Sequence, residues 1–174
     1  MANGCREGSL EAFERLYEMH GPRMKSIALN LLGNVADAED AVQEAFLKVY
    51  RAARSFRGRS SFSTWVYRVL VNTCYDVMRR GKRRPESVPT DEDDFSPARG
   101  TDHPLRLSLE QCLARLRPRH RSVFLLFEVE GFSHREIGEI LEVAEGTSKT
   151  LLFAAKRELQ GMLWSAGAAA RASS

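Results

Sequence analysis

The side chains best suited to bind a ligand lie between Phe62 and Arg80, where aromatic, basic and amide residues recur at helical spacing. At about 100° per residue, one arc of the predicted helix collects Trp65, Arg68, Asn72, Tyr75, Asp76 and Arg79. Aromatic rings stack on unpaired bases, guanidinium groups pair with phosphates, and an amide can read a base edge. This arc therefore favours binding of single-stranded nucleic acid. The alternative is that Trp65 belongs to the core and the arginines only keep the surface soluble.

Basic residues flank this helix on both sides and would attract phosphates without regard to base sequence. Two arginines, Arg57 and Arg59, precede it. The basic residues at its other end are Arg79, Arg80, Lys82, Arg83 and Arg84. The opposite arc of the helix is apolar and predicts a buried face made of Val66, Leu70, Cys74 and Val77, widened by Tyr67 and Met78.

A second candidate surface lies on an acidic helix predicted from Asp37 to about Arg54. Its buried stripe consists of Ala38, Val42, Ala45, Phe46 and Val49. Leu47 falls instead in the polar arc, among Asp37, Glu39, Asp40, Gln43 and Glu44. A leucine framed by carboxylates is suited to docking on a partner protein, whereas the alternative is an ordinary solvated helix face.

A third candidate surface lies between Ser133 and Gln160, where two short helical patterns are joined by the tight connector 142–146. This is helix-turn-helix spacing, with Ser133 and Thr147 as predicted N-caps, and the second helix of such a pair enters the major groove of DNA. Its outer face carries Lys149, Thr150, Phe153, Lys156 and Arg157. The aromatic ring could contact thymine methyl groups while the basic groups hold phosphates. A plain helical hairpin is the alternative.

The remaining elements are also helical in pattern, and no convincing strand pattern interrupts them. In the N-terminal part, a helix is predicted after its N-cap Ser9 and is broken by Gly21-Pro22; a second runs from Arg23 to Leu32. In the C-terminal part, helices are predicted for 105–116 and from Pro118 to Gly131, and the Ala-rich tail after Gly161 is expected to fray.

Charge divides the chain into three parts. The net charge is +6 for residues 1–84, −5 for residues 85–104 and +2 for residues 105–174. The acidic part contains four of the six prolines and the run Asp91-Glu92-Asp93-Asp94. This composition predicts two helical modules joined by an extended, flexible linker, with a plain solvated tether as the alternative for its role.

Cysteine and histidine usage argues against a metal site. The 3 cysteines and 4 histidines show no ligand spacing, so we expect no structural zinc and no cofactor. No paired catalytic residues or phosphate-binding loop occur, which argues against an enzyme. Without a signal peptide or an apolar run near 18 residues, the protein is expected to be soluble and cytosolic, with reduced thiols.

Taken together, these motifs resemble the extracytoplasmic-function (ECF) group of the sigma-70 family of RNA polymerase sigma factors. The acidic run followed by Gln43-Glu44 and Phe46 is similar to the polymerase-binding helix of that family. The stretch 55–68 together with Asn72 is similar to its promoter-melting segment, which captures a flipped base of the −10 element in the loop before the helix. The stretch 133–159 is similar to its −35-binding domain. The resemblance covers residues 9–160.

The resemblance implies an all-α fold of two small helical domains joined by a flexible acidic linker. Residues 1–84 would form the sigma region 2 bundle, and residues 85–104 the linker, which in the family threads the polymerase cleft. Residues 105–164 would form the region 4 helix-turn-helix, followed by a disordered tail at 165–174. Asp91 to Asp94 could mimic nucleic-acid phosphates in that cleft.

The resemblance also assigns roles to particular residues. The polymerase-binding residues would be Asp37, Glu39, Asp40, Gln43, Glu44 and Leu47. The residues that bind the −10 element would be Arg57, Ser60, Ser61, Trp65, Arg68, Asn72, Asp76, Arg79 and Arg80. The residues that bind the −35 element would be Ser133, Arg135, Thr147, Lys149, Thr150, Phe153, Lys156 and Arg157.

The expected partners are the largest and second-largest subunits of core RNA polymerase, promoter DNA in duplex and single-stranded form, and an anti-sigma factor that could hold the cytoplasmic chain at the membrane without membrane insertion. Leu151 and Ala154 depart from the family pattern because basic residues are common there, and Glu142 stands where a helix-ending glycine is frequent. The competing hypothesis is a stand-alone helix-turn-helix regulator of duplex DNA. Such a regulator would need neither the acidic helix nor the Trp65 and Asn72 face.

Overall fold

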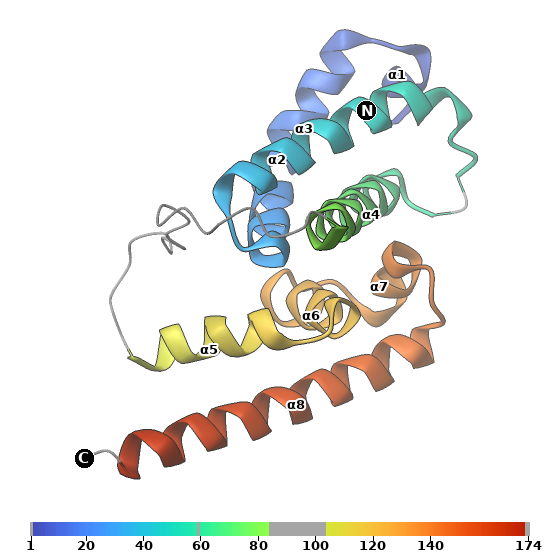
Figure 1. Cartoon of the computed structure of the whole chain (residues 1–174). Coiled ribbons are helices and arrows are strands. Elements are labelled where there is room, and N and C mark those ends of the chain that lie inside the picture. The colour runs from blue at the N-terminus through green and yellow to red at the C-terminus, as the bar shows by residue number, and fades with distance from the viewer. Residues whose placement is uncertain (1, 59, 84–103, 173–174) are drawn as a thin grey trace.

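The computed structural model describes residues 2–58, 60–83 and 104–172, and within these ranges every regular element is a helix (Figure 1). The all-α prediction is therefore confirmed. The elements are α1 (Ala2–Glu7), α2 (Leu10–Leu32), α3 (Val35–Ala52), the 3-10 turn η1 (Ala53–Ser55), α4 (Phe62–Arg83), α5 (Pro104–Arg115), α6 (Pro118–Phe124), the π-helical turn η2 (Leu125–Val129), α7 (His134–Leu141) and α8 (Glu145–Ala172). The predicted linker, with Asp91 to Asp94, lies outside the described residues except for Pro104, as do Arg59 and Arg84.

Helix α2 passes through Gly21-Pro22 without a break, which corrects the prediction of two separate helices. Proline costs a helix about 3 kcal/mol because it lacks an N–H donor and its ring crowds the preceding turn. Here both arms of the helix are anchored in one core. Phe13 and Leu16 are buried before the proline, and Met24 and Ile27 are buried after it. Each of these side chains contributes roughly 1.5–3 kcal/mol on burial, so tertiary packing outweighs the local penalty.

The ends of α2 and α3 follow the capping signals of the sequence. The Ser9 hydroxyl accepts the first-turn N–H of Ala12 at 3.3 Å, which confirms it as the N-cap of α2. Gly33 ends this helix in the left-handed region at φ 84°, where glycine meets no Cβ penalty. Asn34 then caps α3 by accepting the N–H of Asp37 at 2.8 Å. This tight connection allows α2 and α3 to pack side by side.

Helix α4 lies between α2 and α3 on one side and the C-terminal helices on the other (Figure 1). Its predicted apolar arc is buried at Val66, Leu70 and Cys74, and Tyr67 is buried with them. Burial raises the pKa of the Cys74 thiol to about 12, so this cysteine is a small, unreactive core residue. The first turn of α4 is capped by Ser61, whose hydroxyl accepts the N–H of Thr64 at 3.0 Å.

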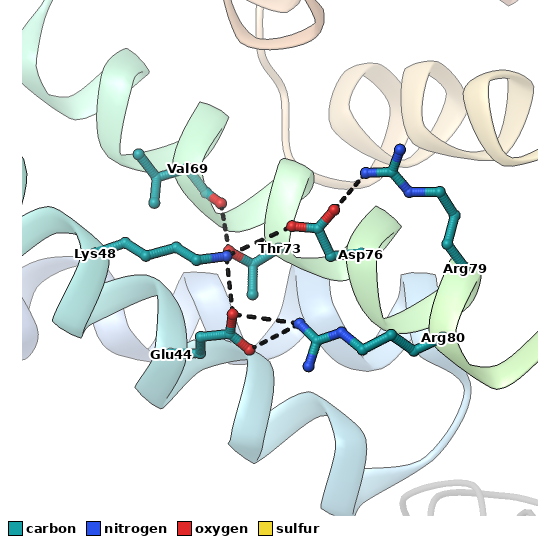
Figure 2. A network of polar contacts seen from close by, with 7 residues as sticks. All are labelled: Glu44, Lys48, Val69, Thr73, Asp76, Arg79 and Arg80. Carbon is teal, nitrogen blue, oxygen red and sulfur yellow. Dashed lines mark hydrogen bonds and ion pairs between the residues drawn. The ribbon is translucent and has the colours of Figure 1, made fainter. Parts of the chain in front are cut away.

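A polar network joins α3 to α4 beside this core (Figure 2). The Lys48 ammonium lies 2.9 Å from a carboxylate oxygen of Glu44 and 3.6 Å from one of Asp76. It also donates to the Thr73 hydroxyl at 3.1 Å, and that hydroxyl donates to the Val69 carbonyl at 2.8 Å. Lys48 therefore holds two acidic side chains from different helices in fixed positions.

Two arginines of α4 complete the network (Figure 2). Arg80 donates to both carboxylate oxygens of Glu44, at 3.2 and 3.3 Å, and Arg79 pairs with Asp76. The hydrogen bond from Lys48 has the largest effect on the pKa of Glu44 and lowers it. Burial opposes this lowering, but the hydrogen bond from Arg80 adds to it, so that the pKa lies below its ordinary value. Burial would raise the pKa of Asp76, but the hydrogen bond from Arg79 and the charge of Lys48 outweigh it and lower that pKa.

Helices α7 and α8 form the predicted helix-turn-helix. Ser133 caps α7 as predicted, in a capping box: its hydroxyl accepts the N–H of Glu136, whose carboxylate accepts the N–H of Ser133 at 2.9 Å. The Ser133 hydroxyl also donates to the Glu136 carboxylate at 2.7 Å, and this bond, followed by the one from the Ser133 N–H, lowers the pKa of Glu136. The connector begins at Glu142, which adopts the left-handed region at φ 55° in the position where glycine is frequent. Gly138 packs directly under the connector and is buried.

Helix α8 corrects two predictions. It begins at Glu145, so Thr147 lies inside its first turn and is not the N-cap. It continues to Ala172, so residues 165–172 are helical where a disordered tail was predicted. Alanine has the highest helix propensity of all residues, and the Ala-rich segment after Gly161 extends the helix rather than fraying it.

The N-terminal helices (α1–α4) and the C-terminal helices (α5–α8) pack against each other (Figure 1). Helix α7 packs on α4, and α6 and η2 contact α2. One continuous apolar core includes Leu70 and Val71 from the first group and Ile137 and Leu141 from the second. A smaller core joins α5 to α8 through Cys112, Leu116, Ala155 and Leu159. The two groups thus share buried surface.

The described residues lack two kinds of feature. None of their helices combines the length and apolar character needed to cross a bilayer. Within the same ranges, no three His, Cys, Asp or Glu side chains come together as a metal-binding group. The three cysteines are buried and are not joined in disulfides.

Replacing Gly138 with alanine should destabilise the C-terminal helices. The new methyl group would lie 2.8 Å from the backbone carbonyl oxygen of Val143, which is too close for two such atoms. We expect the free energy of unfolding, measured by urea denaturation, to fall by about 1–3 kcal/mol. Gly161→Ala is the matched control, because its methyl group meets no atom within 4 Å and should stabilise the helix by roughly 0.5–1 kcal/mol. Equal stability of the two variants would contradict this packing.

Replacing Lys48 with methionine should raise the pKa of the Glu44 carboxyl, because the Lys48 hydrogen bond is the largest cause of its lowering. The pKa can be followed by NMR titration of the Glu44 side-chain carboxyl carbon. Arg15→Met is the control, since it removes the exposed partner of Glu11 on α2 and leaves the network intact. An unchanged Glu44 pKa in Lys48→Met would show that the ammonium does not hold this carboxylate.

Candidate nucleic-acid and protein interfaces

The α3 surface, defined by the six side chains assigned to polymerase binding, faces solvent over most of its extent. Asp37, Glu39, Asp40 and Gln43 are exposed. Leu47 is 56% exposed, as its place in the polar arc predicts. Glu44 is the exception, because it turns toward α4 and is held by Lys48 and Arg80. The α3 surface therefore presents one leucine within a mostly unneutralised acidic face.

Two aromatic pairs extend the α3 surface onto α2. Tyr17 and Phe46 have ring centroids 5.0 Å apart, and Phe13 and Tyr50 have centroids 4.8 Å apart. Both tyrosines are about half exposed, although Tyr17 lies one helical turn after the buried Phe13. Sequence reasoning missed this extension because periodicity locates a stripe but not its solvent-facing edge. The exposed leucine and the tyrosines together suit a protein partner.

A pocket of about 310 Å³ opens at the start of α4, next to Trp65. Trp65 is half-buried and packs, with tilted rings, against Phe56 and Phe62, whose ring centroids lie 5.2 and 5.4 Å away. The pocket is lined by Ala52, Ser55, Phe56, Arg57, Ser60, Trp65 and Arg68. Trp65 therefore packs against neighbouring aromatic rings and also lines an open pocket.

This pocket combines the groups that an unstacked base needs. The aromatic rings of Phe56 and Trp65 offer stacking surface, and the guanidinium groups of Arg57 and Arg68 offer donors for base edges and phosphates. Arg68 also lies 3.5 Å from the Ser60 hydroxyl. Ser61, predicted to contact DNA, instead uses its hydroxyl to cap α4. Phe56 was missed because the loop sequence gives no period from which to place it.

Further along α4, the predicted DNA-binding residues differ in availability. Asn72 is exposed. Asp76, Arg79 and Arg80 belong to the network with Lys48 and Glu44, so the two arginines already have acidic partners. A nucleic-acid phosphate would have to replace these carboxylates, which are themselves exposed or half-exposed. Glu44 and Arg80 thereby connect the α3 surface to the α4 face.

The outer face of α8 is exposed to solvent, and α8 itself lies on the side of the molecule away from the N-terminal helices (Figure 1). Phe153 is 64% exposed, and the Arg157 guanidinium lies 6.0 Å from the centre of its ring. The two lysines have acidic partners: Lys149 lies 2.7 Å from Glu145, and Lys156 lies 2.6 Å from Glu128. The face thus carries one unshielded aromatic ring among cations that are partly neutralised.

The hydroxyl residues assigned to this surface have structural partners. Ser133 caps α7, and the Thr150 hydroxyl donates to the Gly146 carbonyl at 3.0 Å. Arg135 and Thr147 are exposed, next to the start of α7 and in the first turn of α8. The pairing of the two helices also depends on His134, which contacts the Ser148 hydroxyl at 3.0 Å and stacks on Phe127. This buried contact was not anticipated, because it joins residues far apart in the sequence pattern.

Comparison with known proteins gives the same assignment for both halves. The family model Sigma-70 region 2 matches residues 16–84, and Sigma-70, region 4 matches residues 106–159. The ECF RNA polymerase sigma factor SigE of Mycolicibacterium smegmatis is 32% identical over 164 residues, which cover 90% of this chain and 63% of that protein. The RNA polymerase sigma factor CarQ of Myxococcus xanthus is 32% identical over 148 residues, covering 83% of this chain and 84% of CarQ.

Solved structures agree over nearly the whole chain. The sigma factor RpoE, in complex with the anti-sigma factor NepR from Bartonella quintana, matches with a TM-score of 0.70 and 26% identity, covering 88% of this chain and 98% of RpoE. CnrH, in complex with the cytosolic domain of CnrY, shares the fold with a TM-score of 0.72 and 21% identity, covering 94% and 95% of the two chains. With these likenesses and the three surfaces above, the chain belongs to the sigma-70 family of RNA polymerase sigma factors, in its ECF group.

Proposed function

We propose that this ECF sigma factor is a non-catalytic, dissociable subunit that binds core RNA polymerase and directs it to promoters. In this proposal the α3 surface docks on the largest polymerase subunits, the α4 face reads and melts the −10 element, and the outer face of α8 reads the −35 element. The region 2 part would span residues 1–84 and the region 4 part residues 105–164, as the sequence predicted.

The observation that carries the proposal is the α3 surface. Leu47 is exposed among carboxylates on a helix whose opposite face is buried in the core. A protein that only bound duplex DNA would gain nothing from an acidic surface, because it would repel phosphates. This surface therefore favours a polymerase subunit over the competing hypothesis of a stand-alone helix-turn-helix regulator.

The pocket beside Trp65 supports a role in strand separation. Opening duplex DNA costs about 1.4 kcal/mol per base-pair step, so melting needs a site that binds and stabilises an unstacked base. The aromatic rings and the arginines of the pocket can provide this stabilisation through stacking and hydrogen bonds. Asn72, exposed two turns further along α4, can then read a neighbouring base edge.

The face of α8 supports duplex recognition with a modest electrostatic contribution. Phe153 can contact thymine methyl groups in the major groove, and Arg157 beside it can reach phosphate. Lys149 and Lys156 must first leave Glu145 and Glu128. Together with Leu151 and Ala154 at positions where basic residues are common in the family, this predicts that −35 binding relies on shape and apolar contact more than on charge.

An anti-sigma factor is the further partner we propose, acting in the cytoplasm. Support comes from the likeness to RpoE, whose solved structure is a complex with the anti-sigma factor NepR. The exposed leucine and tyrosines next to α3 suit such a protein partner, which would compete there with polymerase.

Retention of the chain on immobilised core RNA polymerase tests the proposed function. Leu47→Ala should weaken retention about tenfold, as expected for loss of one anchor in an interface. Leu10→Ala is the matched control, because Leu10 is also an exposed leucine but lies outside the α3 surface. If the wild-type chain is not retained at moderate salt, the stand-alone regulator becomes the better account.

Asn72→Ala should separate promoter opening from assembly. The side chain is exposed, so the variant should fold and bind core polymerase normally. Open-complex formation, measured by permanganate reactivity of unpaired thymines, should fall about tenfold because the base-edge contact is lost. Asn3→Ala removes an exposed amide from α1 and should leave both steps unchanged. Loss of assembly in Asn72→Ala would contradict the division of roles between α3 and α4.

A further inference from the structure

A cavity of about 640 Å³ lies between helix α4 and the start of helix α6. This volume is typical of sites that bind small molecules. The described residues that line it include no carboxylate; they combine aromatic and apolar side chains with the amide of Asn72 and the basic groups of Arg79, Arg117, Arg119 and His120. The three basic residues around the start of α6 have no role in the proposed function. The cavity is therefore a candidate site for a separate ligand.

Arginine side chains give one part of the cavity its positive charge. Arg117 and Arg119 are exposed at the start of α6, and α4 contributes Arg79. Asp76 already pairs with Arg79 (Figure 2), so Arg117 and Arg119 are better suited to hold an added anion. Planar guanidinium groups bind phosphate oxygens through pairs of parallel hydrogen bonds. This part of the cavity therefore suits a phosphate group.

An aromatic ring and an amide from α4 form another part of the cavity. The Tyr75 hydroxyl lies 2.7 Å from that of Ser122 on α6, which is fully buried and donates to the Pro118 carbonyl, so tyrosine is the donor. This bond fixes the tyrosine ring as a surface on which a base can stack. Asn72 lies three residues earlier on the same face of α4, is exposed, and can hydrogen-bond a base edge.

The aromatic and the basic parts of the cavity lie close together. Burial raises the pKa of the Tyr75 hydroxyl, whereas the bond with Ser122 and the nearby charge of Arg119 lower it in part. Arg119 is thus near the ring that would hold a base. Also on α6, Nδ1 of His120 lies 2.9 Å from a carboxylate oxygen of Glu158, which connects this wall of the cavity to α8. A ligand with its ring on Tyr75 can therefore reach the arginines with an anionic group.

We propose that this cavity binds a nucleotide with terminal phosphates. Its base would lie on Tyr75 beside Asn72, and its phosphates would pair with Arg117 and Arg119. A simple anion would leave the ring and the amide unused, and an uncharged ring would leave the arginines unused. The site is formed jointly by α4, α6 and α8. A bound nucleotide would cover Asn72 and compete there with the −10 strand. This consequence rests on the proposed function of α4, whereas nucleotide binding itself does not.

Fluorescence titration of the full-length chain with mant-ADP, without polymerase or DNA, measures nucleotide binding directly. Arg117→Gln combined with Arg119→Gln should weaken binding at least about tenfold, because charge-assisted hydrogen bonds to phosphate are lost. Asn72→Ala should weaken it roughly fivefold through the loss of one uncharged hydrogen bond. All three side chains are exposed, so both variants should fold. Arg15→Gln is the matched control and should bind as the wild-type chain does, because Arg15 is an exposed arginine of α2 outside the cavity.

Unlabelled competitors identify which part of the nucleotide the cavity recognises. ADP should displace the probe at a concentration at least about tenfold lower than adenosine or pyrophosphate, because each of these carries only one of the two recognised groups. A thymidine dinucleotide represents a DNA strand, since its only phosphate is an internal phosphodiester, and it should also compete at least about tenfold less well than ADP. If pyrophosphate were as effective as ADP, the cavity would be an anion site only. If the dinucleotide were as effective, it would be a site for a strand. Either result overturns the proposal.

NMR of the methionine methyl groups locates the bound nucleotide. Unlabelled ADP should shift the Met78 resonance, because this side chain lines the cavity, and should leave that of the exposed Met19 on α2 unchanged. The proposal is overturned if the wild-type chain does not bind ADP, if the double arginine variant binds it as tightly, or if Met78 is unaffected. Neither measurement contains polymerase or promoter DNA, so such a result would leave the proposed function standing. Conversely, a chain that binds ADP but is not retained on core polymerase would contradict only the proposed function.

Discussion

Helix α4 packs against other helices on two sides, and this packing determines where the rest of the molecule lies. Its apolar arc completes the core with α2 and α3, while α7 packs on its other flank. The side chains between these contacts, including Trp65, Arg68 and Asn72, are the ones suited to single-stranded DNA. The same helix therefore carries the side chains suited to single-stranded DNA and the contacts with the C-terminal helices.

Each of the candidate surfaces also contains charges that are paired within the chain. Glu44 holds Arg80, Glu145 holds Lys149, and Glu128 holds Lys156. Exposed pairs of this kind are worth little, so a polymerase subunit or a phosphate can replace either partner at low cost. The pair between Arg23 and Glu130 is different, because the Glu130 side chain is only 9% exposed and its partner belongs to the other helix group. Exposed pairs thus suit rapid exchange of partners, whereas the contact of Glu130 with Arg23 joins the two helix groups.

Local signals in the sequence predicted much of the fold. Ser9, Gly33 and Ser133 end or begin helices as expected, because capping depends on a few neighbouring residues. The exposure of Leu47 and Phe153 followed from helical period alone. Helix α2 crosses Pro22 and Glu130 pairs with α2 for reasons that are tertiary, so no local pattern could predict them. The pocket beside Trp65 depends on Phe56 in a loop without periodicity, and only its Arg57, Ser60, Trp65 and Arg68 were foreseen.

The central claim is that this chain gives core RNA polymerase its promoter specificity. In vitro transcription on a genomic promoter library, with start sites mapped in the presence and absence of the chain, tests it most directly. The account predicts discrete start sites that depend on the chain, each preceded by two sequence elements at a constant separation, since α4 and α8 belong to one protein. Start sites that are the same with and without the chain would contradict it.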